Sequence, residues 1–453
     1  MTATLEPGTL TGPRGWPLLG NLPAFARDPL AFFEDLRDRH GDWVPWSLGP
    51  RRALLVSRPE HVTELLAGVE HSFDPMDLGW AFRHLLGEGV VVATGEDWRR
   101  KRALVQPVVR PRQVKAYAAT MVEYAARLAE SWEDGRRVDV LREMAGLTQR
   151  IAVRTLFGSE AAGQEEAIGR AMGVAQRELG AEARGLTLFL PPWVTTPGRH
   201  RLRGAVHRLD QEIERVIAEH RAAAAAGEER DDLLSRLLAA RDDTGAPLSA
   251  RELRDEAITL YIGGHETTST TLVWAWQLLS RSPGARARLD AELDSVLGDR
   301  LPTFEDHARL PWTQQIVRES LRLYPPIWLI SATAREGASL GGRALPTGTA
   351  VWCSQWSVHR DPRWFEDPLA FRPERWDPDP PLRTVEQAWF PFGGGPRACL
   401  GARFALVEAV LLLAVLARRF HVDTGPGLAR PFPGLTLQPA DPVPATLRRT
   451  GTA

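Results

Sequence analysis

The stretch Phe392-Gly-Gly-Gly-Pro-Arg-Ala-Cys-Leu-Gly401 decides how this sequence is interpreted. It places Cys399 behind a run of glycines and before a helical pattern at about 401–419. Glycines let a backbone approach a flat partner closely, and helix N-terminal amides together with Arg397 favour a thiolate. Most lone cysteines are buried and inert, and Cys353, in a strand-like run, fits that description. The surroundings of Cys399 instead predict a thiolate or a metal ligand.

This segment resembles the haem-ligand signature Phe-x-x-Gly-x-Arg-x-Cys-x-Gly of the cytochrome P450 superfamily. The matching residues are Phe392, Gly395, Arg397, Cys399 and Gly401. The resemblance implies a bound haem b, with Cys399 as the iron ligand, Arg397 beside a propionate and Phe392 beside the sulfur. A thiolate ligand pushes electron density onto iron and favours O–O cleavage. The implied fold is mainly α with a smaller β part, and a long central helix crosses the haem.

A long helix is predicted after Ser249-Ala-Arg-Glu252, which has the form of a capping box. The pattern ends at Pro283 after about 30 residues, or about 45 Å. Its interior holds two adjacent glycines, Gly263 and Gly264, each costing about 1 kcal/mol relative to Ala. Missing side chains would admit a flat ligand, although a crossing of two helices would use them equally well.

The residues after these glycines, Glu266 and Thr267, form a carboxylate–hydroxyl pair. Gly263 to Thr267 resemble the family motif (Ala/Gly)-Gly-x-(Asp/Glu)-Thr, with Gly at a position where Ala is commoner. The resemblance implies that Glu266 relays protons and that Thr267 hydrogen-bonds dioxygen and helps deliver the proton that breaks the O–O bond. His265, between them, is interpreted as a packed or solvated residue and not as a ligand.

Two further elements of the sequence suggest charged anchors. Glu319 and Arg322 lie three residues apart on one helix face, and with Arg375 of a Pro-Glu-Arg-Trp element they resemble the family's buried ion-pair triad, which implies a structural clamp. Trp98 and Arg102 share a helix face at i and i+4. They resemble the family's Trp-x-x-x-Arg element, which binds a haem propionate; the alternative is an exposed basic face, which we expect for Arg99, Arg100 and Lys101.

Composition narrows the function class. The chain has 453 residues, 56 basic and 57 acidic residues, and a net charge of −1. This balance argues against nucleic-acid binding, and two cysteines exclude a disulfide scaffold. Only two basic residues are lysines, which indicates a GC-rich genome. No run approaches the roughly 20 apolar residues of a membrane span, so we expect a cytoplasmic protein, and a monomer.

The punctuation of the chain predicts its organisation. Residues 1–22 are expected to be extended, and 23–453 to form a single haem-binding domain. A helix is predicted at 29–40, and a hairpin is predicted from strands at 43–48 and 52–56 around a Gly49-Pro50 turn. Gly and Pro break a helical region near 180–185 and at 191–198, and 221–243 is predicted to be solvated helix.

The resemblance also implies a substrate pocket and separate electron donors. Its predicted walls are the loop 73–93, the helix 261–264, the segment 326–331 and the turn 434–436; the named side chains are Val91, Tyr261, Ile327, Leu329 and Leu435. These apolar residues favour a hydrophobic substrate, and by family analogy a terpenoid or carotenoid first and a fatty acid second. Electrons are expected from a ferredoxin with its reductase, or from a flavodoxin. The candidate docking residues are Arg99, Arg100, Arg110, Arg112 and Arg403.

The resulting hypothesis is a haem-thiolate monooxygenase. Two alternatives remain at this stage. One is a haem-thiolate isomerase or dehydratase that needs no electrons, and the other is a non-catalytic haem sensor. The intact Glu266–Thr267 pair disfavours both, because neither alternative needs a proton relay.

Overall fold

The computed structural model describes residues 3–4, 11–158, 162–184, 190–378 and 383–451. The chain divides into two compact units, one made of residues 1–77 with 318–399 and the other of 78–317 with 400–453. The expectation of one domain over 23–453 stays a prediction. Most of residues 1–10 lie outside the described part.

A five-stranded sheet organises the first unit, in the order β2-β3-β9-β6-β4. Its strands are β2 (Trp43–Leu48), β3 (Arg51–Val56), β4 (Phe73–Pro75), β6 (Ile330–Ala334) and β9 (Ala350–Cys353). The β2–β3 hairpin matches the predicted turn, and β3 pairs with β9 in parallel, Leu54 opposite Val351. Leu54, Val351 and Cys353 belong to one buried apolar cluster, so the sheet supplies much of this core.

The first unit also contains short helices, which precede, separate or follow these strands along the chain. They are α1 (Leu22–Arg27), α2 (Pro29–His40), α3 (Pro59–Gly68), α14 (Gln355–Val358), α15 (Arg383–Ala388), η4 (Pro373–Trp376) and η5 (Gly395–Arg397). The prediction of a helix at 29–40 is confirmed: the Asp28 carboxylate caps it by accepting from the N–H groups of Leu30 and Ala31. A small sheet, β1-β8-β7, consists of β1 (Ala3–Thr4), β7 (Ser339–Leu340) and β8 (Arg343–Ala344).

The second unit is built from helices. They are α4 (Gly79–Leu86), α5 (Gly95–Val105), η1 (Gln106–Val109), α6 (Pro111–Ser131), α7 (Val140–Phe157), α8 (Ala162–Arg184), α9 (Pro197–Ala225), α10 (Leu233–Ala239), α11 (Ala250–Ser280), α12 (Pro283–Leu297), η3 (Glu305–Arg309) and α16 (Ala402–Arg419). The helix α13 (Pro311–Leu323) spans the boundary of the two units. The mainly helical prediction is confirmed.

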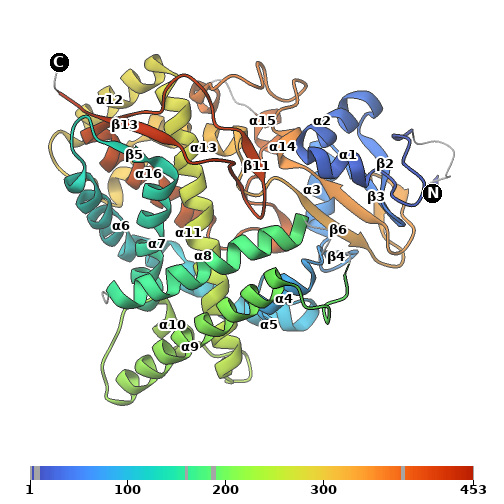
Figure 1. Cartoon of the computed structure of the whole chain (residues 1–453), viewed down its shortest axis with the longest axis horizontal. Helices are drawn as coiled ribbons and strands as arrows, with labels where there is room; N and C mark the ends of the chain where they lie inside the picture. Colours follow the sequence, from blue (N-terminus) through green and yellow to red (C-terminus); the bar gives the residue numbers. More distant parts are fainter. Residues whose placement is uncertain (1–2, 5–10, 159–161, 185–189, 379–382, 452–453) are drawn as a thin grey trace. The chain divides into compact units, whose positions relative to one another are not determined.

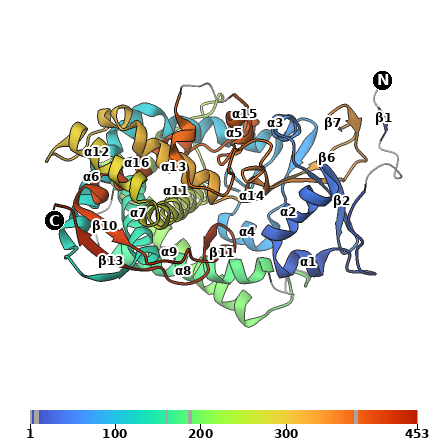
Figure 2. The same cartoon turned by 90° about the horizontal axis from the view of Figure 1, so that it is seen from above.

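The long helix α11 is the axis of the second unit. It packs against α7 and α16, and Figure 2 shows it almost end-on with α7 and α16 beside it. The predicted capping box is present: Ser249 Oγ accepts from Glu252 N at 3.2 Å, and Glu252 accepts from Ser249 N at 2.8 Å. Trp274 is fully buried in its C-terminal half and donates to Leu437 O at 2.8 Å. A helix buried on most sides needs this apolar composition all round.

The strands of the second unit come mostly from the C-terminal part of the chain. The sheet β10-β13-β5 consists of β5 (Arg137–Asp139), β10 (Phe420–Asp423) and β13 (Pro444–Arg449), and the hairpin β11-β12 of β11 (Pro431–Pro433) and β12 (Leu437–Pro439). Figure 1 shows β13 beside β5, and β11 in the hairpin. The hairpin carries the turn that the sequence assigned to the substrate pocket.

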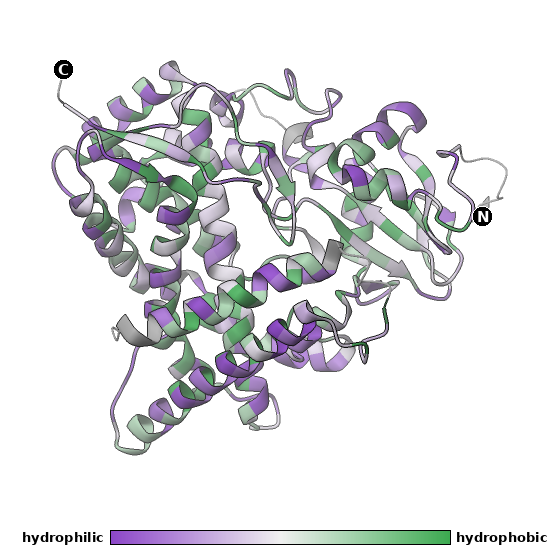
Figure 3. Ribbon diagram, in the orientation of Figure 1, coloured by the Kyte–Doolittle hydropathy of each residue, from purple (hydrophilic) through white to green (hydrophobic). Residues whose placement is uncertain are grey.

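The predicted break near 180–185 agrees with α8, which ends at Arg184; residues 185–189 lie outside the described part. One prediction for the helical region is wrong: the helix expected at 221–243 is interrupted, because α9 ends at Ala225 and Gly227 follows with φ +78°. Along α8 and α9 purple and green residues interleave (Figure 3), as expected for amphipathic helices. Within the described ranges, no helix is both long and apolar enough to cross a membrane.

Candidate functional site

The loop around Cys399 differs from the surroundings of the other cysteine. Cys399 is exposed, and its N–H donates to Phe392 O at 2.9 Å. Cys353 is completely buried in β9, where burial raises the pKa of its thiol to about 12. Of the two cysteines, Cys399 is therefore the one whose sulfur a metal ion could reach. The helix α16 begins at Ala402, so Cys399 precedes it, in agreement with the helical pattern predicted at about 401–419.

The glycines of this loop serve a contact that the sequence did not predict. Gly395 has φ +63°, and a Cβ there would lie 2.1 Å from Leu66 O. Gly394 likewise faces the Leu66 side chain, 3.2 Å from a Cβ on Gly394. The missing side chains therefore let the loop lie on the end of α3, and the expectation that these glycines admit a flat partner does not describe Gly395.

Arg397 forms an ion pair with a carboxylate that lies outside the recognised motifs. Its Nε donates to Glu70 Oε1 at 2.7 Å, and Glu70 is only 2% exposed. Burial lowers the pKa of Arg397, while the Glu70 carboxylate raises it. Glu70 lies in a turn with φ +76°. The pair fixes the direction of the guanidinium, which the resemblance assigns to a propionate.

The structure brings Glu319, Arg322 and Arg375 together. Arg322 donates to both Glu319 oxygens, at 2.9 and 2.7 Å, and Arg375 Nε donates to Oε1 at 3.1 Å. The side chains of Glu319 and Arg322 are 0% exposed. Trp376 Nε1 donates to Glu319 Oε2 at 3.0 Å. Trp376 thus supplies a hydrogen bond that a Phe at this position would lack.

One face of α11 is open although the helix is otherwise mostly buried. Leu260, Gly263, Gly264 and Thr267 follow the i, i+3, i+4, i+7 spacing of a single face and are exposed or half-buried. A Cβ on Gly263 or Gly264 would meet nothing within 4 Å. The glycines therefore do not serve a helix crossing within the described residues, and they leave a flat strip of backbone.

The hydroxyl and histidine of this motif are anchored by the helix itself. Thr267 Oγ1 donates to Gly263 O at 2.9 Å, and its oxygen remains on the open face. His265 lies on the buried side, where Nδ1 is 2.9 Å from Tyr261 O. Burial lowers the pKa of His265, so it is a neutral, packed residue, in agreement with its exclusion from the ligands.

Glu266 lies beside the open face and not on it. Thr436 Oγ1 and Gln438 Nε2 each donate to Oε1 at 2.6 Å, and Gln176 Nε2 donates to Oε2 at 2.5 Å. Burial raises the pKa of Glu266, although the hydrogen bonds from Thr436 and Gln438 lower it. The carboxyl therefore links α11 to α8 and to the β11-β12 hairpin. Sequence reasoning missed these three partners because 90 to 172 residues separate them from Glu266.

A second buried carboxyl was also missed. Glu408 of α16 is 1% exposed, and burial raises its pKa to about 8, with a Thr268 hydrogen bond as the lowering contribution. Its Oε2 has no hydrogen-bond partner among the described residues. Glu408 sits nine residues after Cys399 in an apolar helix, where a single glutamate at a core position was the available signal.

The predicted pocket residues divide into two groups. Val91 and Ile327 are exposed, and Leu329 and Leu435 are half-buried. Tyr261 is 1% exposed, and its ring packs on His265 at 4.7 Å between centroids. The assignment of Tyr261 to an open wall is therefore wrong: a helix turns 100° per residue, so Leu260 and not Tyr261 shares the face of Gly263 and Gly264.

The predicted basic face of α5 is only partly exposed. Trp98 is 7% exposed and belongs to a small apolar cluster, and Arg102 is half-buried. Lys101 is 2% exposed and pairs with Asp97, so the expectation of a solvated Lys101 is wrong.

The candidate docking arginines also differ from one another. Arg100 is neutralised by Asp242 and Glu252, each at 2.6 Å, which removes it from a free docking patch. The exposed candidates are Arg99, Arg110, Arg112 and Arg403.

The residues present fit a haem. A planar group needs a surface without side chains, and the strip at Gly263 and Gly264 offers one on α11. Its iron needs an accessible donor, and Cys399 is an exposed thiol on a different element. The open strip therefore suits the flat face of the group, and the exposed thiol suits its iron.

Comparison with known proteins agrees with these features. The chain matches the family Cytochrome P450 over residues 10–440. It is 38% identical to cyclooctatin synthase of Streptomyces melanosporofaciens, covering 94% of this chain and 91% of that protein. It is 37% identical to cyclooctat-9-en-7-ol 5-monooxygenase of the same organism (95% and 91%), and 34% identical to pentalenene oxygenase of Streptomyces avermitilis (92% and 92%). Such enzymes use a haem iron, O2, a hydrophobic substrate and redox partners. The chain belongs to the cytochrome P450 family and is a P450 monooxygenase.

Proposed function

We propose that this monooxygenase hydroxylates a cyclic terpenoid, using haem b and electrons from a ferredoxin and its reductase. The observation that carries the proposal is the open strip of α11, which places a glycine surface and a hydroxyl on one face of a buried helix. The terpenoid class is supported by the similar Streptomyces proteins, a cyclooctat-9-en-7-ol 5-monooxygenase and a pentalenene oxygenase. A carotenoid or a fatty acid is the second choice.

Cys399, Arg397, Trp98 and Arg102 are proposed to hold the haem. When bound, the haem supplies an iron that binds and activates dioxygen. Cys399 would hold that iron through its thiolate, an electron-donating ligand that favours O–O cleavage. Arg397, oriented by Glu70, and the Trp98–Arg102 face neutralise propionates. Phe392, the first residue of the loop, is proposed to pack beside the sulfur.

The overall reaction requires protons at a buried position. A C–H bond, O2, two electrons and two protons give a C–OH bond and water. Glu266 is proposed to carry these protons, since it is buried beside the open face and burial raises the pKa of its carboxyl. Thr267 presents its hydroxyl oxygen on the open face and is proposed to hold the last proton beside dioxygen.

The remaining assignments concern recognition. Val91, Ile327, Leu329 and Leu435 are proposed to contact the apolar substrate. Arg99, Arg110, Arg112 and Arg403 are the candidates for docking an acidic electron donor, which would make turnover sensitive to salt. The ion-pair triad is proposed as a structural clamp, since Arg322 and Arg375 both donate to Glu319 and Arg322 also donates to backbone oxygens such as His359 O.

The test begins with the spectrum of the reduced protein with and without carbon monoxide. A strongly red-shifted Soret band in the wild type, lost in Cys399→Ser, is expected for a thiolate ligand. The protein is then supplied with NADPH, ferredoxin and ferredoxin reductase, and with cyclic sesquiterpenes, cyclic diterpenes, β-carotene or palmitic acid. Products heavier by one oxygen atom are identified by mass spectrometry.

The outcomes separate the parts of the proposal. Oxygenated terpenoid that depends on Thr267 supports it, and Thr267→Ala is expected to consume NADPH with little product. Turnover of palmitic acid alone would overturn the terpenoid assignment. An unshifted Soret band would overturn the role of Cys399.

A further inference from the structure

Three consecutive residues of α11 contact the last turn of α4 and the segment that follows it. Arg254 Nη1 donates to Leu85 O at 3.0 Å. Asp255 Oδ2 accepts from Glu88 N at 2.9 Å, and Asp255 Oδ1 also accepts from Arg254 at 2.8 Å. Arg254 and Asp255 are 9% and 2% exposed. This part of the helix therefore binds backbone groups that the segment's own turns leave available.

Glu256 continues the series. Its Oε2 accepts from Val90 N at 3.2 Å, and its side chain is buried. From α5, Lys101 Nζ donates to Glu88 O at 2.6 Å. The segment 85–90 is thus fixed by four side chains, and the two carboxylates bind two of its N–H groups, at Glu88 and at Val90.

Two glycines make this contact close. Gly87 has φ +59°, and a Cβ there would lie 2.1 Å from Asp255 Oδ1. A Cβ on Gly89 would lie 2.2 Å from Thr259 Oγ1 and 3.0 Å from Asp255 O. The backbone therefore lies directly on α11, and the segment has one position relative to the helix.

The segment ends in an exposed apolar side chain. Val90 and Val92 are each 5% exposed, whereas Val91 between them is 51% exposed. The N–H groups of Val92 and Ala93 donate to Gly89 O at 2.8 and 2.9 Å. A tight turn therefore transmits the position of Gly89 to Val91.

We propose that Asp255 and Glu256 are positioning residues for substrate recognition, which fix the segment 85–90 on α11 and thereby set where Val91 meets the substrate. This inference rests on the proposed function, which assigns Val91 to the substrate side. The two carboxylates touch neither substrate nor haem, and they act through the backbone that they bind.

The test compares two ligands of the haem iron in the full-length holoenzyme. Imidazole reports the iron alone, and 1-phenylimidazole adds a ring that must fit the substrate side. Their dissociation constants are measured from the Soret shift. For Asp255→Ala and Glu256→Ala we expect the ratio of the phenylimidazole constant to the imidazole constant to rise about fivefold, the equivalent of one hydrogen bond.

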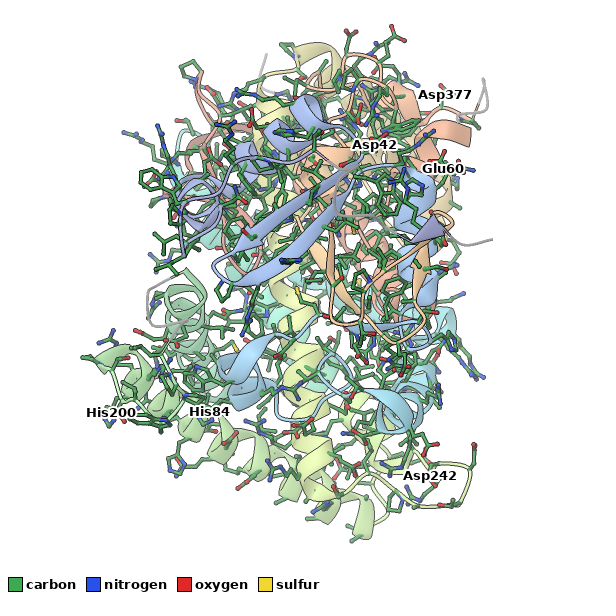
Figure 4. All side chains as sticks on the ribbon, turned by 90° about the vertical axis from the view of Figure 1, so that its right-hand side faces the viewer. Asp42, Glu60, His84, His200, Asp242 and Asp377 are labelled. Carbon is green, nitrogen blue, oxygen red and sulfur yellow. The ribbon has the colours of Figure 1, made fainter. Side chains whose placement is uncertain are left out.

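Conservative and matched variants distinguish positioning from general damage. Asp255→Asn and Glu256→Gln retain an oxygen acceptor, so the ratio should return toward the wild-type value. The control is Asp242→Ala, in the loop before α11 (Figure 4), which removes a partner of Arg100 but no contact to the segment. Its ratio should remain that of the wild type. Val91→Ala should raise the ratio, because the phenyl ring loses its contact.

Several results would overturn the inference. A wild-type ratio in both alanine variants, or in Val91→Ala, would show that the segment does not position the ligand. If the alanine variants fail to take up haem, Gly89→Ala decides, since its methyl group displaces the segment from Thr259: a raised ratio supports the proposal and a wild-type ratio overturns it. If wild-type protein shows no Soret shift with imidazole, the proposed function itself fails, and this inference fails with it.

Discussion

Gly395 and Gly264 are glycines of two motifs of the same family, yet the structure uses them in opposite ways. At Gly395 the position that a Cβ would take is occupied by the backbone of α3. At Gly264 a Cβ would meet nothing within 4 Å. The first glycine lets the protein pack on itself, and the second keeps a surface open. A glycine in a motif thus indicates that a side chain would be in the way at that position. It does not indicate whether the protein itself or a ligand uses the space.

The largest effect is expected on the packed side, at Glu319. Glu319→Ala leaves two buried guanidinium groups without their carboxylate, which should lower the free energy of unfolding by about 3–5 kcal/mol. Denaturant unfolding measures the change. The matched control is Glu386→Ala, which breaks the exposed pair with Arg318 at 3.5 Å and should cost at most about 0.5 kcal/mol. Equal losses in both variants would contradict the clamp.

Gly395→Ala tests the packed glycine directly. The new methyl group meets Leu66 O in a backbone with positive φ, so we expect a loss of about 2–4 kcal/mol from strain and overpacking. Thermal unfolding checks this expectation. Gly425→Ala is the control for positive φ alone, since Gly425 has φ +72° and a Cβ there meets nothing. If both variants lose the same stability, close packing on α3 is not the reason for Gly395.

The core beside the open helix should show a pH dependence from Glu408. Its pKa of about 8 in the folded chain lies above its ordinary 4.5, so the folded protein keeps a proton that the unfolded chain releases. The stabilising contribution of Glu408 should therefore be fully present below pH 4.5. It should decrease as the pH rises toward 8, by about 1.4 kcal/mol per pH unit. Urea unfolding at several pH values should show a shallower slope for Glu408→Gln. Parallel curves would refute the buried neutral acid.

The smallest effect has the opposite sign to that of Gly395. Gly264→Ala should stabilise the haem-free chain by about 1 kcal/mol, because Ala is the better helix former and meets no neighbour. In the same variant, haem uptake should fall, since the methyl group stands on the open strip. Gly263→Ala is the matched variant: it should gain the same stability and retain haem, because the family commonly has Ala there. Haem titration followed by the Soret band distinguishes the two.

Much of the site follows from short-range patterns. The spacing of residues 392–401 indicated a thiolate loop, and the structure leaves Cys399 exposed while Cys353 is buried. The pair Glu319 and Arg322 lies on one turn of a helix, so its proximity follows from helical geometry. The capping box at Ser249 and the hairpin turn at Gly49 are equally local, and both are confirmed.

The errors arose where residues distant in the sequence determine the surroundings of a side chain, because a local pattern does not include them. Arg100 looks like any exposed arginine in the sequence, but Asp242 and Glu252 approach it from more than 140 residues away. Tyr261 was assigned to the pocket wall because the family resemblance points to the helix 261–264 as a whole, whereas the helical rotation turns this side chain to the buried side.

The family could be identified from residue types at fixed short spacings, and the same spacings predict a thiolate loop and an acid–alcohol pair. Which atoms fill the space beside these residues and pair with their charges depends on tertiary contacts. The tertiary structure placed α3 against Gly395, three donors around Glu266 and the segment 85–90 on Asp255 and Glu256. These contacts join residues far apart in the chain, and their positions depend on the packing of whole elements, which no spacing within one segment encodes.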